Sequence, residues 1–298
     1  MTTHTIYKFC GKPVTHDELT LIKEMTEEFW GISRTELAQT LCEILNWTRP
    51  NGRLKGTECR EFLEKLESRS VIRLPKPRKG KTKGACAKTS RSKQGQAQDP
   101  IKGSVKDIGL VSLVELKSPK DSDLWKELVD RYHYLGFKTA FGGCLRYFIQ
   151  VNEENPRILG CLQFSSPAWA LERRDEWIGW DQETRKERLQ LIVQNSRFLL
   201  LPWVEVKGLA SHVLSKAAKR VPGDWEIAFK RRPVLMETFI DKERFSGTCY
   251  KAANWTCLGE TKGRGRMDEK NQFKEPVRTI WVYPLARNYR AFLLGEKV

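Results

Sequence analysis

The sequence predicts a mixed α/β protein, an open sheet with flanking helices that is preceded by a small helical domain of winged-helix type. Three observations lead to this prediction. Residues 1–73 carry helix start signals and apolar stripes, residues 74–104 are rich in Lys, Arg, Gly, Ser and Gln, and residues 105–298 alternate helical and strand patterns. Because single domains contain about 100 to 200 residues, the 298 residues suffice for two domains joined by a flexible linker.

The helical domain, 1–73, opens on two capping boxes, Thr15-His16-Asp17-Glu18 and Ser33-Arg34-Thr35-Glu36. In such boxes the hydroxyl group and the glutamate bind backbone N–H groups that the first helical turn leaves free. Apolar residues at helical spacing follow each box, and a third helix is predicted around 59–66. A short apolar run at 70–74 indicates a strand. Three helices and a strand resemble a winged helix-turn-helix.

A winged helix would place the third helix in a DNA groove. The cations expected to contact phosphates there are Arg34, Arg53, Lys55 and Arg60. The same helix exposes the carboxylates of Glu58, Glu61, Glu64 and Glu67, whereas phosphate affinity comes from cations. Two interpretations stay open for this domain, DNA contact and docking of a partner protein.

Positive charge is concentrated in the linker, 74–104. Ten basic residues face eleven acidic ones in 1–72, ten face one in 73–104, and 33 face 25 in 105–298, for a net charge of +16. Because cations that neutralise phosphates supply much of the affinity for nucleic acid, we expect DNA contacts in the linker and in a second basic stretch at 262–266. The expected contacts are Lys76, Arg78, Lys79, Lys81, Lys83, Lys262, Arg264 and Arg266.

Composition excludes several other classes of protein. Hydrophobic residues make up 40% of the chain, with ten tryptophans, which is too many for a disordered protein. The sequence has neither an apolar run of about 18 residues nor an export signal, so we expect a cytoplasmic protein without membrane contact. Eight cysteines without a CxxC pair favour reduced, buried thiols over a metal site.

The C-terminal domain, 105–298, has a helix and strand order that predicts a partly parallel sheet, because crossover helices join parallel strands. Helices are predicted at 121–134, 209–221 and 247–255, and strands at 144–151, 157–164, 191–203, 234–240, 256–260 and 279–283. The second of these helices is expected to stop at Pro222-Gly223. Residues 165–190, rich in tryptophan and charge, indicate an insertion with its own helices.

Polar residues in the predicted strands and helix ends are candidates for chemistry. Glu237 interrupts an apolar strand, so burial would raise its pKa toward that of a general base, and pairing with a buried arginine such as Arg197 is the structural alternative. His133, between two tyrosines, could transfer a proton or cap a helix. Asn195, Ser196 and Arg197 need partners if buried, and could bind a phosphate, a base or a carboxylate.

Longer segments of the sequence carry a family resemblance. They are Arg131-Tyr132-His133-Tyr134-Leu135-Gly136, Asn195-Ser196-Arg197-Phe198-Leu199-Leu200-Leu201-Pro202-Trp203-Val204, Leu209-Ala210-Ser211-His212, Glu237-Thr238-Phe239 and Gly247-Thr248-Cys249-Tyr250-Lys251-Ala252-Ala253-Asn254-Trp255. Their combination closely resembles the DruA family, named for a component of the Druantia anti-phage system. The resemblance implies a role in phage defence or mobile DNA, and Asn254 joins the substrate-binding candidates.

Element order and the pattern from Gly247 to Gly259 are also similar to the GNAT acyltransferase fold, in particular to its branch with the phage DNA-modifying Mom protein. GNAT enzymes hold the pyrophosphate of acyl-CoA on a Gln/Arg-x-x-Gly-x-Gly/Ala motif at a helix start. The resemblance implies cofactor binding by Lys207, Gly208, Leu209 and Ala210, which the carboxylate of Glu205 weakens. Tyr250 matches a tyrosine acid of those enzymes, with core packing as the alternative.

The preferred prediction is a nucleic-acid-binding component, with DNA as the expected partner, of a bacterial anti-phage defence or mobile-element system. Other proteins of that system would be further partners. The enzymatic alternative is a GNAT-like transferase that modifies a nucleic-acid base or a protein amine, with Glu237, Tyr250 and His133 near the reacting group. A second alternative is an adaptor that recruits partner proteins through the helical domain.

Overall fold

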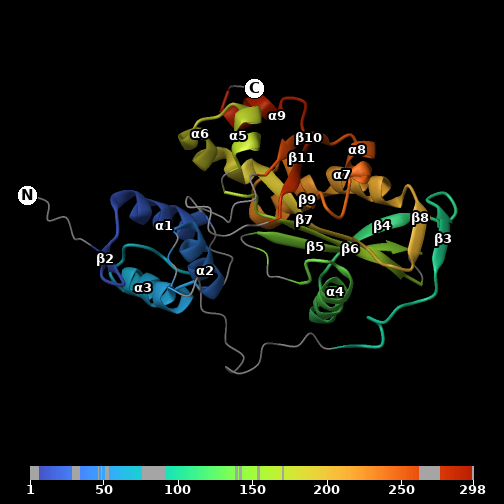
Figure 1. The fold of residues 1–298 in the computed structure, drawn as a ribbon, viewed down its shortest axis with the longest axis horizontal. Coiled ribbons are helices and arrows are strands. Elements are labelled where there is room, and N and C mark those ends of the chain that lie inside the picture. The colour runs from blue at the N-terminus through green and yellow to red at the C-terminus, as the bar shows by residue number, and fades with distance from the viewer. Residues whose placement is uncertain are drawn as a thin grey trace, which may run out of the picture. The chain divides into compact units, whose positions relative to one another are not determined.

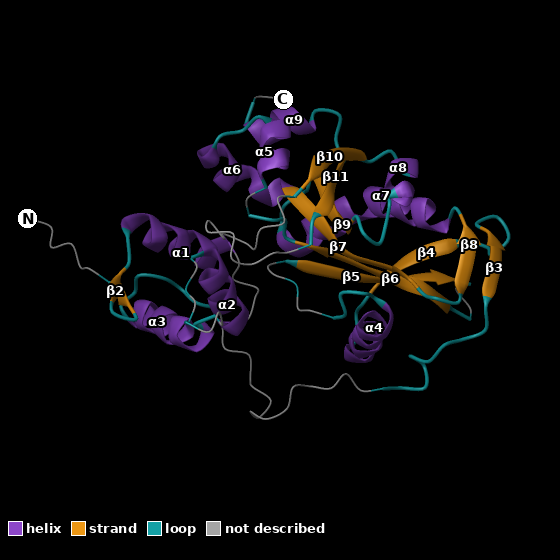
Figure 2. Cartoon of the chain, viewed as in Figure 1, coloured by secondary structure: helices purple, strands orange, loops and turns teal. Residues whose placement is uncertain are grey.

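A computed structural model describes residues 7–28, 34–45, 47, 49–50, 54–75, 91–137, 140, 143–152, 155–169, 171–261 and 276–296. The chain forms two compact units (Figures 1 and 2). The first, the helical unit, is built mainly from residues 1–84, and the second, the α/β unit, from residues 85–140, 144–263 and 276–298.

The helical unit contains a short hairpin and three helices: β1 (Lys8–Phe9), β2 (Lys12–Pro13), α1 (His16–Glu28), α2 (Arg34–Ile44) and α3 (Gly56–Ser68). The first capping box is formed, with Thr15 N–H donating to Glu18 at 2.7 Å and Glu18 N–H donating to the Thr15 hydroxyl at 3.2 Å. The strand predicted at 70–74 does not form, because Val71 and Leu74 donate their N–H groups back to the end of α3. The winged-helix assignment stays a prediction.

The α/β unit is built on a seven-stranded mixed sheet with the order β10-β11-β9-β7-β6-β5-β4. Its strands are β4 (Val111–Glu115), β5 (Cys144–Val151), β6 (Arg157–Ser165), β7 (Ile192–Leu200), β9 (Leu235–Asp241), β10 (Thr256–Glu260) and β11 (Arg278–Pro284). Among the described strands of this sheet only β7 and β9 pair in parallel, and the other neighbours are antiparallel. The predicted fold class, a mixed α/β sheet with flanking helices, is confirmed.

Two helices cover opposite faces of this sheet, α4 (Pro119–Tyr132) and α7 (Leu209–Phe229) (Figure 1). Successive strand residues face opposite sides, and the Tyr147 hydroxyl bonds to Asp224 of α7 at 2.9 Å while the neighbouring Arg146 lies 5.2 Å from the Trp125 ring of α4. α7 continues past Pro222, where the sequence predicted its end. Pro222 is buried in the core together with Trp225 of the next turn, and this packing compensates for the missing N–H.

The predicted insertion forms α5 (Glu172–Ile178), α6 (Gln182–Arg188) and the 3₁₀ turn Leu189–Leu191. It builds a second apolar core with β7, β9, β11 and the C-terminal helix α9 (Tyr289–Leu294). The insertion is therefore fixed to one end of the sheet. The remaining helix, α8 (Thr248–Ala252), follows β9.

Residues 91–104, which the sequence assigns to the linker, pack on the α/β unit. Strand β3 (Ile101–Ser104) pairs in parallel with β8 (Val204–Lys207). Ser92 donates through its N–H and its hydroxyl to Glu127 of α4, at 2.8 and 2.7 Å. The part of the basic segment (residues 73–104) that the structure describes at 91–104 is therefore attached to α4 through Ser92.

Candidate functional site

The parallel ladder at the centre of the sheet is short. β7 and β9 pair only over 192–194 and 235–237, although both strands continue. Against β6, the register of β7 shifts so that Gln163 aligns with Arg197 and Phe164 with Asn195, which leaves Ser196 as the extra residue of a β-bulge. The bulge lies just beyond the point where the parallel ladder ends.

This bulge sends Asn195 and Arg197 to opposite faces of the sheet. In a regular strand residues two apart share a face, but here the two residues align with neighbours on β6 that face opposite sides. Asn195 lies on the face of Phe164, whose ring contacts Tyr147 on the side of α7. Arg197 lies on the other face, where its Nε donates to the Gly136 carbonyl just after α4, at 3.2 Å.

Asn195 is buried at the centre of a satisfied polar network. Its Nδ2 donates to the carbonyls of Gln163 and Arg197, both at 3.1 Å, and its Oδ1 accepts from the Tyr250 hydroxyl at 3.0 Å. Burial, with a smaller contribution from Cys249, raises the pKa of Tyr250. The hydroxyl therefore stays protonated at neutral pH and serves as a donor in the core.

Glu237 is fully buried on β9 and pairs with the insertion. Its Oε1 accepts from the Ala168 N–H at 2.8 Å and its Oε2 accepts from Arg174 Nη1 at 2.9 Å. Burial alone would lower the pKa of Arg174, but the charges of Glu237 and Asp175 outweigh it and raise that pKa. The partner is thus Arg174 of α5 and not Arg197, because the bulge directs Arg197 toward the end of α4.

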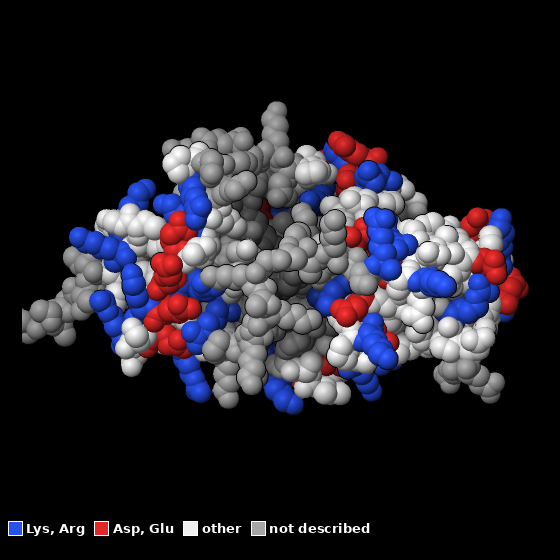
Figure 3. Space-filling model, turned by 90° about the horizontal axis from the view of Figure 1, so that it is seen from below, with Lys and Arg blue, Asp and Glu red and all other residues white. Residues whose placement is uncertain are grey.

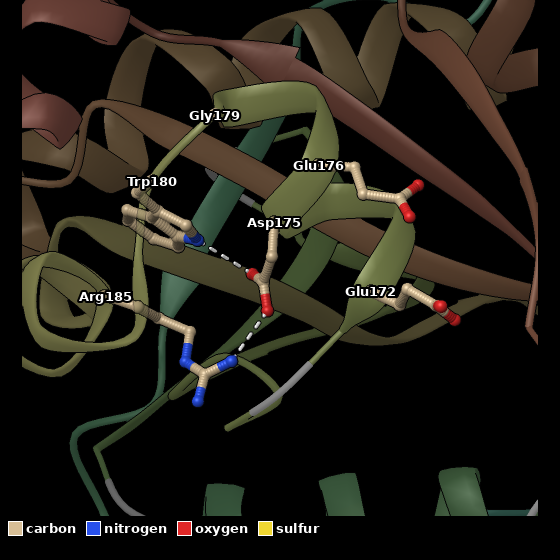
Figure 4. A pocket seen from close by; sticks show the side chains of 6 residues that line it. All are labelled: Glu172, Asp175, Glu176, Gly179, Trp180 and Arg185. Carbon is tan, nitrogen blue, oxygen red and sulfur yellow. Dashed lines mark hydrogen bonds and ion pairs between the residues drawn. The ribbon is translucent and has the colours of Figure 1, made fainter.

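Asp175 extends this pair to the surface of the insertion, where a hollow of about 540 Å³ opens beside α5. The residues that line it are Glu172, Asp175, Glu176, Gly179, Trp180 and Arg185. Asp175 points between Trp180 and Arg185 and accepts from both at 3.0 Å (Figure 4). Its Oδ1 also accepts from Arg174 at 2.8 Å. The oxygens of Asp175 are used in holding the insertion together.

His133 is the C-cap of α4, and its Nδ1 accepts from the Leu135 N–H at 3.2 Å. Burial, helped by the charge of Arg197, lowers the pKa of His133 to about 4. The imidazole is therefore neutral at pH 7, and its ring stacks on Tyr134 at 4.9 Å. These contacts agree with the alternative prediction that His133 caps a helix.

The three predicted catalytic residues do not form one constellation. Glu237 and Thr238 are successive residues of β9 and face opposite sides, and Thr238 bonds to the Asn195 carbonyl on the side of Tyr250. Within the described residues no hydrogen bond or ion pair joins any two of Glu237, Tyr250 and His133. Asn254 is exposed in the turn after α8 with φ of 62°, a conformation that asparagine tolerates.

The predicted cofactor segment lies between β8 and α7. Gly208 is the N-cap of α7 with φ of 79°, Leu209 is buried in the core, and Lys207 is exposed. Glu205 is exposed and pairs with Lys102 of β3 at 3.2 Å. Gly208 thus adopts a left-handed conformation that favours glycine, and the carboxylate of Glu205 beside it is partly neutralised by Lys102.

Of the cations predicted to contact DNA from the helical domain, two are engaged within the helical unit. Arg34 pairs with Glu67 at 2.9 Å and donates to the Pro75 carbonyl at 2.8 Å, and Arg60 lies 3.9 Å from Glu64. Lys55 lies over the Phe9 ring at 5.9 Å. The other predicted contacts lie outside the described residues: Arg53, Lys76, Arg78, Lys79, Lys81, Lys83, Lys262, Arg264 and Arg266.

Sequence reasoning did not select Arg174, nor Tyr134 and the neighbouring Arg244 and Phe245. Arg174 lies 63 positions from Glu237, and nothing in the local pattern of a charged helix marks one arginine as buried. Arg244 and Phe245 follow β9 in a turn and contact Tyr134 at 5.1 and 5.5 Å. An apolar residue next to a cation just after a strand was the only available signal.

These features define a two-unit protein with a helical unit and a mixed α/β unit whose central bulge carries an arginine. The DruA family, described as Druantia protein DruA, matches residues 65–273, about two thirds of the chain. The chain belongs to the DruA family and so to the proteins of an anti-phage defence system. No curated protein matches it. None of the helices in the described residues is long and apolar enough to cross a membrane.

Solved structures similar to the chain include acetyltransferases. The spermidine N-acetyltransferase of Vibrio cholerae, in complex with CoA and spermine, has a TM-score of 0.39 at 9% identity over 59% of this chain and 95% of that chain. An N-acetyltransferase of Staphylococcus aureus Mu50 has a TM-score of 0.36 at 11% identity over 59% of this chain and 99% of that chain. FeeM, an N-acyl amino acid synthase from uncultured soil microbes, has a TM-score of 0.34 at 12% identity over 59% of this chain and 90% of that chain.

Proposed function

We propose that this protein is a cytoplasmic, DNA-binding component of a Druantia-type defence system. The observation that carries the proposal is the charge of residues 73–104, where ten basic residues face one acidic residue. The described end of this basic segment is held on the α/β unit, because Arg131 and Tyr132 both donate to the Gly95 carbonyl, at 3.2 and 3.1 Å. Arg91 and Lys93 are exposed beside this attachment. A basic segment fixed at one end can neutralise phosphates along a strand.

The described charges of the helical unit contribute less to this role. Arginines pair with glutamates across its helices, Arg34 with Glu67 and Arg49 with Glu58, each at 2.9 Å. Figure 3 shows Asp and Glu side chains of this unit in a stripe between Lys and Arg side chains. Paired cations gain little from a phosphate, because the existing ion pair must break first. We therefore assign the affinity to the basic segment and the α/β unit.

The transferase alternative finds less support in the contacts. Glu237, its proposed general base, has both carboxylate oxygens occupied and is fully buried. A general base must come within hydrogen-bond reach of the proton that it removes. Tyr250, its proposed acid, donates to Asn195 on the other face of the sheet.

The test is the affinity of the full chain for DNA over a range of salt concentrations. The slope of log affinity against log salt falls by about 0.9 for each phosphate contact with duplex DNA that is lost. Changing Lys76, Lys79, Lys81 and Lys83 to Gln should flatten this slope. A matched control changes Lys8, Lys12, Lys23 and Lys65 of the helical unit to Gln and should leave it nearly unchanged. Equal effects of the two variants would refute the assignment.

A further inference from the structure

Tyr134 lies among cations and aromatic rings at the end of the sheet near the bulge. The Arg244 guanidinium lies 5.1 Å from its ring centroid, the Phe245 ring lies at 5.5 Å, and His133 stacks on it at 4.9 Å. Burial and the Asp241 charge raise the pKa of Tyr134, so its hydroxyl is protonated at neutral pH. This group presents both donors and ring faces.

Arg197 brings a half-buried positive charge to the same place. Its hydrogen bonds go to the carbonyls of Gly136 and Ser196, and within the described residues no carboxylate lies at ion-pair distance from it. Burial lowers the pKa of Arg197, and Arg278 nearby lowers it further. Asp241 aligns with Arg278 across the β9–β11 pair, and its Oδ2 lies 4.0 Å from Arg244. Arg197 and Arg244 thus bring two guanidinium groups to the neighbourhood of Tyr134, and Arg197 has only carbonyl partners among the described residues.

The turn after β9 holds Arg244 and Phe245 in place. Both residues donate their N–H groups to the Asp241 carbonyl, at 3.2 and 2.9 Å, and the Glu243 N–H donates to the Asp241 side chain at 3.1 Å. Phe245 is nevertheless 51% exposed, and the Arg244 side chain is 58% exposed. An ordered turn that exposes an aromatic ring beside a guanidinium is preorganised for a ligand with a flat face and a negative charge.

We propose that four of these residues, the Tyr134 cluster (Tyr134, Arg197, Arg244 and Phe245), bind one nucleotide of a single-stranded nucleic acid. The arginines hold the phosphate and Phe245 stacks on the unpaired base. This inference rests on the proposed function and deepens it, because it names the form of nucleic acid and the site.

The test uses the full chain, a short labelled oligothymidylate and an abasic strand of the same length. Phe245→Ala should weaken binding to the oligothymidylate about tenfold and to the abasic strand by less than about twofold, because only the former has bases to stack. Arg244→Gln should weaken binding to both by about tenfold. Lys242→Gln is the control, since it removes a cation from the same turn that pairs with Glu260 at 2.9 Å, and it should change either affinity by less than about twofold.

Three results would overturn this inference. The first is an equal loss of affinity for both strands with Phe245→Ala. The second is a loss of affinity with Lys242→Gln as large as that with Arg244→Gln. The third is displacement of the oligothymidylate by acetyl-CoA, which would make the cluster a cofactor site. Wild-type binding that none of the variants affects would refute the cluster and leave the proposed function standing. If the wild-type chain bound neither strand nor duplex DNA at low salt, both proposals would fail. Thermal melts of each variant check that the exposed substitutions leave the fold intact.

Discussion

Replacing Arg174 by methionine should destabilise the α/β unit strongly. The change removes the guanidinium but keeps a long side chain, so Glu237 is left fully buried with one remaining hydrogen bond, from the Ala168 N–H. Removing one partner of a buried ion pair costs about 3 to 5 kcal/mol, since the other charge stays without compensation. Asp175 loses its bonds to Arg174 but keeps Trp180 and Arg185.

The reverse substitution, Glu237→Gln, should cost less, about 1 to 3 kcal/mol. Arg174 then keeps Asp175 as its partner, through Nε at 2.9 Å and Nη2 at 2.8 Å. The double variant should be more stable than the sum of the two single losses predicts, because the loss of the ion pair is counted in both single variants.

Urea unfolding followed by circular dichroism gives these free energies. The result that would refute the structural role is an Arg174→Met variant as stable as the wild type. A Glu237→Gln variant with wild-type stability and no defence activity would instead restore Glu237 as a general base. Phage plating on cells that carry the complete defence system, with the variant in place of the wild-type chain, supplies that second measurement.

Three further predictions concern the core of the α/β unit. Tyr250→Phe should lower the free energy of unfolding by about 1 to 3 kcal/mol, measured by urea melts, because it leaves the buried Asn195 Oδ1 without its donor. Burial lowers the pKa of His133 to about 4, so between about pH 6.5 and 4 the unfolded chain binds a proton that the folded chain does not. The free energy of unfolding should therefore fall by up to about 3 kcal/mol over this pH range. The His133→Gln variant, which lacks the imidazole, should lose less. Gly160→Ala should destabilise, because its Cβ would overlap the backbone of β7, whereas Gly223→Ala, with open space in a helix, should raise the melting temperature.

Much of the fold could be predicted from the sequence because periodicity and turn residues are local signals. Six of the seven strands of the sheet, the insertion and the first capping box appear where the pattern placed them, whereas the edge strand β4 was not predicted. Pro222 was misjudged, since the packing that carries α7 past it is tertiary. The bulge at Ser196 could not be foreseen, because register depends on the neighbouring strand.

The candidate site was less accessible to prediction for the same reason. Glu237 stood out as a carboxylate in an apolar strand, but its partner comes from a helix in the insertion. Arg197 was selected as a polar residue that needs partners, and the structure places it beside Tyr134, which was not selected. Which charges pair and which stay available for a ligand is decided by the contacts between elements, and a single sequence does not contain them.

The salt dependence of DNA binding by the wild-type chain is the decisive measurement for the proposed DNA-binding function. We expect binding at low salt, with an affinity that falls steeply as salt increases, by a log–log slope of about 4 if about four cations contact phosphates of a duplex. Calorimetry with acetyl-CoA on the same sample should then give no heat of binding. If the protein binds acetyl-CoA and shows no affinity for DNA at any salt concentration, the proposed DNA-binding function is wrong.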